Sequence, residues 1–140
     1  MRVLKINDDL EIISHKTHEI TKVVNGKCDL IITMNITRSL AKALLDKEKT
    51  VLFFCSCSRD LEDLVKERYF IATNHAKVYR TNDYVFMSSS NLSLSSWDEI
   101  TVKLKRTEEL DNFIDEFRNS LKLKNDFVRA FYWWNIKMFL

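Results

Sequence analysis

The stretch His75-Ala-Lys-Val-Tyr-Arg-Thr-Asn-Asp-Tyr-Val-Phe-Met-Ser-Ser-Ser-Asn91 holds two strand-like runs separated by a turn. Residues 75–80 and 84–89 are rich in β-branched and aromatic side chains, which favour strands. Asn82 and Asp83 between them suit the backbone of a tight turn. The sequence therefore predicts an antiparallel hairpin whose open end carries polar residues.

Strands and helices alternate around this hairpin. Asp8, with Glu11 three residues later, has the spacing of a capping box, which favours the start of a helix there. Another strand-like run follows the hairpin. The apolar patterns predict strands over residues 3–6, 29–34, 51–55, 69–73 and 100–104, and helices over residues 8–24, 37–47 and 58–68, with Ser58 as the cap of the last. The runs 29–34 and 51–55 are typical of strands buried on both faces.

Two amphipathic helices are predicted at the end of the chain. Apolar residues recur at helical spacing from Leu110 to Leu121 and again from Phe127 to Met138, and the second helix, about 124–139, is rich in aromatic residues. Strands separated by helices imply crossover connections. We therefore expect an α/β fold, a three-layer α-β-α sandwich with a mixed, largely parallel sheet, in one domain over residues 1–140.

Composition excludes several classes of function. The chain has 140 residues, 22 Lys and Arg against 20 Asp and Glu, one glycine and no proline. A net charge of +2 gives no strongly basic surface from which to infer nucleic-acid binding by charge alone. A single glycine cannot build a glycine-rich phosphate loop. Any interaction with phosphate must therefore come from a site of side chains.

Cysteine usage and apolar runs suggest where the protein works. Cys28, Cys55 and Cys57 are an odd number, and the first residues lack the pattern of a secretory leader. No apolar run approaches the ~18 residues of a membrane span. We expect a reducing compartment, the cytoplasm, or the host cytoplasm if the chain is viral, and no membrane association.

The open end of the hairpin gathers groups that suit a phosphate. His75 and Lys77 share one face of their strand, Ser89 and Asn91 share a face of the next, and Glu99 stands where the following strand begins. Lys77 and Asn91 can donate hydrogen bonds to phosphate oxygens, and Ser89 can add a hydroxyl. Glu99 can hold the imidazole by its second nitrogen.

These residues resemble the motif of the phospholipase D superfamily. That motif is H-x-K-x4-D followed by G-S-x-N, and here His75-Ala-Lys77 is followed by Ser89-Ser-Asn91. Asn82 stands where the family has aspartate, and Ser88 stands where it has glycine. The order of strands and helices over about residues 3–121 is also similar to one half of that fold. Short members with a single motif, which are homodimeric nucleases, resemble this chain most.

The resemblance implies metal-independent cleavage of DNA or RNA, with no cofactor. His75 would attack phosphorus to form a phosphohistidine, and a second His75 from the partner subunit would protonate the leaving oxygen. One unprotonated and one protonated imidazole are needed at the same pH, which a pair across a two-fold axis provides. The implied catalytic residues are His75, Lys77, Asn91 and Glu99. Ser89, Lys77 and Asn91 would bind substrate in a homodimeric active site.

Two other functions are compatible with the same motif. One is a phospholipase-type phosphodiesterase, which the aromatic tail suits. The other is a degenerate member of the fold that binds nucleic acid or a protein without cleaving. The substitutions at Asn82 and Ser88 are the features that favour this second alternative.

Other polar clusters have simpler interpretations. His15, His18 and Cys28 could suggest a metal, but we favour a solvated helix face for the two histidines. Cys55 and Cys57 are more typical of packing at a strand end than of a redox or zinc site. The tail around Trp133 and Trp134 is expected to cap the core or a dimer, with a protein partner or a membrane surface as the alternative.

Overall fold

The computed structural model describes residues 1–57 and 59–139, with residues 125–139 described by their backbone alone. A mixed sheet forms the centre, in the strand order β1-β2-β10-β9-β8-β3-β5-β7. Its strands are β1 (Arg2–Asn7), β2 (Leu10–Lys16), β3 (Leu30–Ile32), β5 (Val51–Phe54), β7 (Glu67–Phe70), β8 (Val78–Arg80), β9 (Tyr84–Ser88) and β10 (Asp98–Lys105). A second, two-stranded sheet pairs β4 (Asn35–Ile36) with β6 (Ser56–Cys57).

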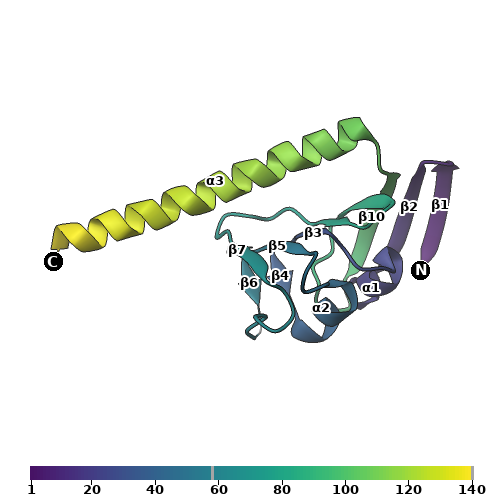
Figure 1. Ribbon diagram of the computed structural model, residues 1–140. Coiled ribbons are helices and arrows are strands. Elements are labelled where there is room, and N and C mark those ends of the chain that lie inside the picture. Colours follow the sequence, from purple (N-terminus) through teal and green to yellow (C-terminus); the bar gives the residue numbers. More distant parts are fainter. Residues whose placement is uncertain (58, 140) are drawn as a thin grey trace.

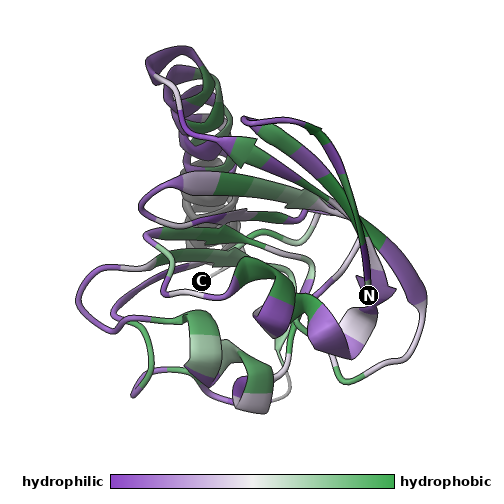
Figure 2. Ribbon diagram, turned by 90° about the vertical axis from the view of Figure 1, so that its right-hand side faces the viewer, coloured by the Kyte–Doolittle hydropathy of each residue, from purple (hydrophilic) through white to green (hydrophobic). Residues whose placement is uncertain are grey.

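Helices cover both faces of the sheet, so the molecule has three layers (Figures 1 and 2). The long helix α3 (Glu108–Phe139) lies on one face, where Ile114 and Leu121 pack against the side chains of β3, β8 and β9. The short helices η1 (Thr17–Glu19), α1 (Ile20–Val24) and α2 (Arg38–Leu44) lie on the other. The predicted α/β class with helices on both faces is therefore confirmed.

The buried strands β3 and β5 were predictable because they are apolar runs without alternation. All three residues of β3 are buried, and Leu52 and Phe53 of β5 are fully buried. β5 pairs parallel with β3 and with β7. A parallel pair needs a crossover, and α2 supplies the one between β3 and β5. The elements predicted over residues 29–34, 37–47 and 51–55 are thus present with shorter bounds.

The sheet is mostly antiparallel, so the prediction of a largely parallel sheet is wrong. Only the β3–β5 and β5–β7 pairings are parallel, whereas the five other pairings in the eight-stranded sheet are antiparallel. The reason is that β1 with β2 and β8 with β9 form hairpins, and β10 lies between these two hairpins.

The helix predicted over residues 8–24 is replaced by β2 and the short helices η1 and α1. Ile13, His15 and Thr17 are buried while Ser14 and Lys16 are exposed, which is the period of two of a strand. β2 pairs with β1 on one side and β10 on the other. Hydrogen bonds to two neighbouring strands outweigh the local helical pattern.

The expected cap at Asp8 and Glu11 is wrong for the same reason. The turn before β2 is held by the Asn7 side chain, whose Oδ1 accepts a hydrogen bond from the Asp9 backbone N–H at 2.8 Å. The carboxylate that bonds back to the backbone at a helix start is Glu19, which accepts from the Lys16 N–H at 2.9 Å.

Two further helix predictions need correction. Where a helix is predicted over residues 58–68, the described part forms a single turn, in which the Val65 N–H donates to the Leu61 carbonyl at 3.1 Å, and Arg68 belongs to β7. Ser58 lies outside the described residues. At the C-terminus α3 is one helix instead of two, because no glycine or proline follows Leu121 to end it. The roles predicted for Trp133 and Trp134 concern side chains outside the described set.

The predicted hairpin is confirmed and occupies the middle of the sheet. β8 and β9 pair in the register Val78 with Met87 and Arg80 with Val85, and the Thr81 N–H donates to the Tyr84 carbonyl across the turn. Strands β10 and β3 flank the hairpin on its two sides. None of the helices in the described residues is long and apolar enough to cross a membrane.

Candidate active site

His75 and Lys77 lie at the open end of the central hairpin, just before β8. Lys77 is held in place because its carbonyl accepts a hydrogen bond from the Ser88 N–H of β9 at 3.0 Å. Its side chain is 8 % exposed, whereas the His75 ring is exposed. The Lys77 Nζ lies 3.3 Å from Nδ1 of His75. The structure therefore brings the predicted imidazole and ammonium together.

The environment of Lys77 is unusual for a lysine. Burial lowers the pKa of its ammonium below the ordinary value, and the negative charge of Glu99 partly opposes this effect. Among the described residues no carboxylate forms a salt bridge with Lys77, and His75 is the hydrogen-bond partner of its Nζ. A buried ammonium with so few partners is costly to the fold. An anion at this place would relieve that cost.

Ser89 and Glu99, two predicted site residues, form a pair with each other that the sequence did not predict. The Ser89 hydroxyl donates to Glu99 Oε2 at 2.9 Å, and the Ile100 N–H of β10 donates to the same hydroxyl oxygen at 3.0 Å. Thr17 donates to the other carboxylate oxygen of Glu99 at 3.3 Å. The expected contact of Glu99 with the His75 ring is not formed. Glu99 instead orients Ser89, because β10 places its carboxylate beside that hydroxyl.

Asn91 is fixed through its carbonyl oxygen. Oδ1 accepts hydrogen bonds from the Asn35 backbone N–H at 3.0 Å and from the Thr33 hydroxyl at 3.3 Å. A backbone N–H is a donor, so it assigns this atom as oxygen. The amide Nδ2 of Asn91 has no partner among the described residues. Asn91 can therefore donate two hydrogen bonds outward.

The two halves of the site are joined through residues that the sequence did not single out. Asn74 is buried, and its Nδ2 donates to the Thr33 carbonyl at 3.2 Å and to the Ala76 carbonyl at 3.1 Å. Thr33 in turn bonds Asn91. Asn74 thus ties the segment that carries His75 to the strand end that holds Asn91. The position of Asn74 directly before His75 is the sequence feature that could have indicated its role.

A buried chain of hydrogen bonds lies behind Ser89 and Asn91. The Ser90 N–H donates to Ser88 Oγ at 2.8 Å, Ser88 Oγ lies 2.7 Å from Thr101 Oγ1, and Thr101 Oγ1 lies 2.7 Å from Nε2 of His15. The other nitrogen of His15 is 2.7 Å from the Lys16 carbonyl. Since a carbonyl only accepts, Nδ1 carries a proton, and in the neutral ring Nε2 accepts from Thr101.

These hydrogen bonds correct the expectation for His15 and give Ser88 a structural role. His15 is 5 % exposed in a strand and is no part of a solvated helix face, whereas His18 is exposed in η1. Ser88, which stands in place of the motif glycine, supplies the acceptor for the Ser90 N–H. The serine therefore serves to hold the backbone between Ser89 and Asn91.

The second departure from the motif lies at the opposite end of the hairpin. Asn82 is exposed in the turn, where its Oδ1 accepts from Lys49 Nζ at 2.9 Å. The whole of β8 separates it from His75. The substitution at Asn82 therefore does not touch the residues that would meet a substrate.

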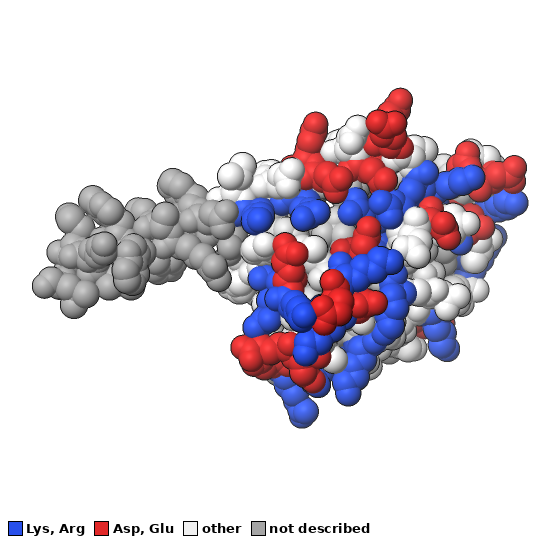
Figure 3. Space-filling view, viewed as in Figure 1, with Lys and Arg blue, Asp and Glu red and all other residues white. Residues whose placement is uncertain are grey.

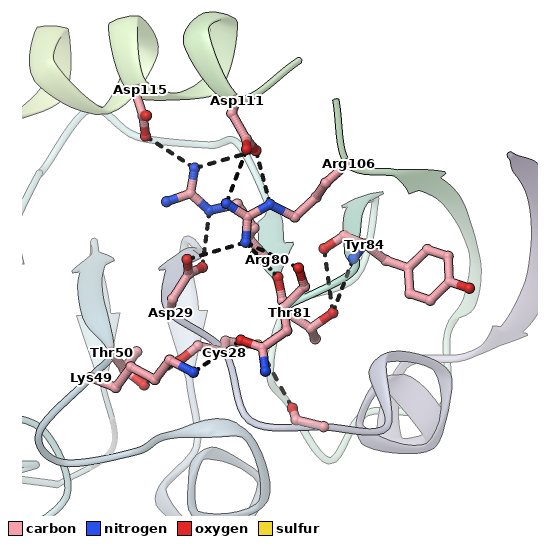
Figure 4. A network of polar contacts seen from close by, with 12 residues as sticks. Cys28, Asp29, Lys49, Thr50, Arg80, Thr81, Tyr84, Arg106, Asp111 and Asp115 are labelled. Carbon is pink, nitrogen blue, oxygen red and sulfur yellow. Dashed lines mark hydrogen bonds and ion pairs between the residues drawn. The ribbon is translucent and has the colours of Figure 1, made fainter. Parts of the chain in front are cut away.

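A network of charged residues occupies that turn end (Figure 4). Arg80 Nε donates to Asp29 at 2.9 Å and Arg80 Nη1 to Asp115 at 3.0 Å. Arg106 donates two hydrogen bonds to the Asp111 carboxylate, at 2.9 and 3.1 Å. Asp111 and Asp115 belong to α3, so these contacts fasten the long helix to the sheet.

The other candidate ligands remain dispersed. No group of three or more His, Cys, Asp or Glu side chains in the described residues could hold a metal ion. Burial raises the pKa of the Cys28 thiol to about 12. Cys55 Sγ lies 3.4 Å from the Ala72 carbonyl, and Cys57 is exposed.

Comparison with known proteins adds no further evidence, since protein-family models, curated proteins and solved structures all gave no match. The functional argument therefore depends on the geometry of the hairpin end.

Proposed function

We propose that this protein is a metal-independent phosphodiesterase that cleaves nucleic acid at the open end of the β8–β9 hairpin. The observation that carries the proposal is the buried Lys77 ammonium, 3.3 Å from His75 and without a salt-bridge partner in the described chain. A phosphate diester supplies the anion that this ammonium lacks. The Asn91 amide adds donors at the neighbouring strand end, where Glu99 orients the Ser89 hydroxyl. No cofactor is part of the proposal.

The chemistry proceeds in two displacements. In the resting site the ammonium of Lys77 donates to His75 Nδ1; a bound phosphate is a stronger acceptor and frees that nitrogen. The imidazole attacks phosphorus, so a P–N bond forms and the P–O bond to the leaving strand breaks. Water then attacks phosphorus and gives its proton to the group that protonated the leaving strand, while the P–N bond breaks and His75 is regenerated. Lys77 and Asn91 stabilise the negative charge on the non-bridging oxygens in both steps.

The leaving oxygen needs a proton, which this site does not supply from its own histidines. His15 has both ring nitrogens engaged by Thr101 and Lys16, and the Nδ1 of His18 faces the Ser95 carbonyl at 3.3 Å. We therefore assign the general acid to a second His75 across the two-fold axis of a homodimer. The loop between Asn91 and Glu99 exposes Leu94 and Trp97, which are 63 % and 73 % exposed. These apolar side chains beside the site support an interface there.

The deciding experiment incubates the purified protein with plasmid, single-stranded DNA, RNA and phosphatidylcholine vesicles in excess EDTA. Cleavage of a nucleic acid that His75→Ala abolishes supports the proposal. Hydrolysis of the lipid alone identifies a phospholipase-type enzyme instead. Nucleic-acid binding without cleavage identifies the non-catalytic alternative, and activity that returns only with added metal overturns the mechanism.

Mixing tests the shared site. When His75→Ala chains are mixed with wild-type chains, a heterodimer has one imidazole and cannot provide both nucleophile and acid. Activity is then expected to fall faster than the wild-type fraction. A strictly linear fall, or a cleaving monomer in sedimentation, contradicts the homodimeric site.

A further inference from the structure

A polar cleft beside Asn91 holds the second cationic site of the molecule. It has a volume of about 440 Å³ and is lined by Thr37, Arg38, Ser39, Lys42 and Arg59. These side chains comprise three cations and two hydroxyls, with no carboxylate among them. Such a set of charged and hydroxyl groups matches a phosphate group.

Two of the three cations are free for a ligand. Arg38 is engaged by the Asp63 carboxylate and by the Asp60 carbonyl, the latter at 3.0 Å. Lys42 and Arg59 are exposed, and neither forms a salt bridge within the described residues. Two carboxylates act on this group, Asp63, which is paired with Arg38, and Asp60, so three cations stand against two acidic side chains. The cleft therefore keeps a local positive charge.

The cleft is directly connected to the candidate active site. The Thr37 N–H donates to the Leu92 carbonyl at 2.7 Å, and Leu92 follows Asn91 in the chain. Asn35, two residues before Thr37, donates its N–H to Asn91 Oδ1. Two residues of extended chain span roughly 7 Å.

Charge elsewhere gives the cleft its significance. On the face drawn in Figure 3, Lys and Arg are interleaved with Asp and Glu and form no continuous basic surface. Binding of a polyanion to that face would gain little from the balanced charge. A local excess of cations next to the candidate active site is therefore the feature that can hold a strand.

We infer that the cleft of Thr37, Arg38, Ser39, Lys42 and Arg59 binds a flanking phosphate of a single-stranded polynucleotide whose scissile phosphate lies at His75. The inference rests on the proposed function. A polynucleotide offers a second phosphate at a fixed distance from the first along the strand, which a phosphatidylcholine headgroup does not. The cleft thus specifies the substrate class of the site.

The test compares Lys42→Ala/Arg59→Ala with Lys22→Ala/Lys47→Ala, an exposed pair with the same change in net charge. Binding of a labelled single-stranded oligonucleotide is measured by anisotropy across a salt series, and hydrolysis of bis(p-nitrophenyl) phosphate is measured in parallel. We expect the cleft variant to bind about tenfold more weakly and to lower the slope of log K against log salt by roughly 1.4, from two contacts of ~0.7 each. Hydrolysis of the small diester should be unchanged in both variants.

The outcomes separate the two proposals. Equal oligonucleotide binding by the cleft and control variants overturns the cleft, whatever the activity at His75. Cleft-dependent binding in a protein that cleaves neither substrate supports the cleft and overturns the proposed hydrolysis. Binding of phosphatidylcholine vesicles without binding of the oligonucleotide overturns the inferred substrate class.

Discussion

The two ends of the β8–β9 hairpin use their polar side chains in opposite ways. At the turn end, Arg80 and Arg106 are paired with the carboxylate of Asp29, directly before β3, and with carboxylates of α3. At the open end, Lys77 has no salt bridge in the described chain, and the Asn91 amide has donors to spare. Satisfied charges fasten elements together, whereas unsatisfied donors are available to a ligand. The same two strands therefore carry stabilising ion pairs at one end and the candidate site at the other.

The largest expected effect is loss of activity on removal of the imidazole. His75→Ala should lower nucleic-acid cleavage at least about 10³-fold, because nucleophile and acid are both lost from the dimer. The ring is exposed, so the thermal midpoint should change little. Cleavage in EDTA and a circular dichroism melt provide the two measurements. Retained cleavage would place the chemistry outside the open end.

Lys77→Met should separate activity from stability most clearly. Loss of the phosphate contact should lower the rate about 10²- to 10³-fold. The apolar side chain should at the same time stabilise the fold by on the order of 1 kcal/mol at neutral pH, because a buried, unpaired ammonium is removed.

The pH dependence of this gain follows from the direction of the pKa shift. The pKa of Lys77 is lowered in the folded state, so the unfolded chain binds the proton more tightly. The free energy of unfolding of the wild type therefore rises with pH through the interval between the two pKa values. The advantage of Lys77→Met should be full below that interval and vanish above pH 10.5. Urea melts at neutral and alkaline pH measure it; a variant that is less stable at neutral pH would contradict it.

Arg80→Ala, at the turn end, should lower the stability of the fold without lowering cleavage. The Arg80 side chain is 8 % exposed, and its removal leaves Asp115 without its ion pair and leaves Asp29 only the longer contact with Arg106, at 3.4 Å. Breaking a buried ion pair costs about 3 kcal/mol. The free energy of unfolding should fall by that amount, while cleavage per folded molecule stays unchanged. Arg38→Ala, at a more exposed pair, serves as control and should cost less than about 1 kcal/mol.

Thr101→Val tests the chain of hydrogen bonds that lies behind the open end of the hairpin. The substitution keeps the shape but removes the Thr101 hydroxyl that contacts Nε2 of His15 and the Ser88 hydroxyl, which should cost about 1–3 kcal/mol. Because Ser90 lies between Ser89 and Asn91, we also expect a several-fold loss of cleavage. Ser14→Ala, on the exposed face of the neighbouring strand, is the matched control and should change neither quantity.

The contrast between the two ends was only partly predictable from sequence. The alternation and turn residues of the hairpin, and the apolar runs of β3 and β5, are local patterns, and each is confirmed. β2 was missed because its strand depends on pairing with β10, which lies more than 80 residues away in the sequence. Local signals at Asp8 and Glu11 cannot report such a partner.

The residues of the site were predictable from sequence, but the hydrogen bonds that support them were not. The contact of His75 with Lys77 agrees with the prediction from strand alternation, whereas Glu99, predicted to hold His75, contacts Ser89 instead. The supporting contacts of Asn74 and Thr33 arise where separate strand ends meet, so no spacing in the sequence reveals them. The same holds for the ion pairs of the turn end, which join β3, β8 and α3.

The smallest expected effect concerns the position where the resembling family has aspartate. Asn82→Asp should leave cleavage unchanged and shift the free energy of unfolding by less than about 0.5 kcal/mol, because the residue is exposed and gains only a surface ion pair with Lys49. A thermal melt and a cleavage assay, each with Asp83→Asn as the neighbouring control, measure both quantities. A large rise in activity on restoring the aspartate would show that the turn end controls the open end. It would then favour a degenerate origin for the natural chain, in which Asn82 itself had weakened catalysis.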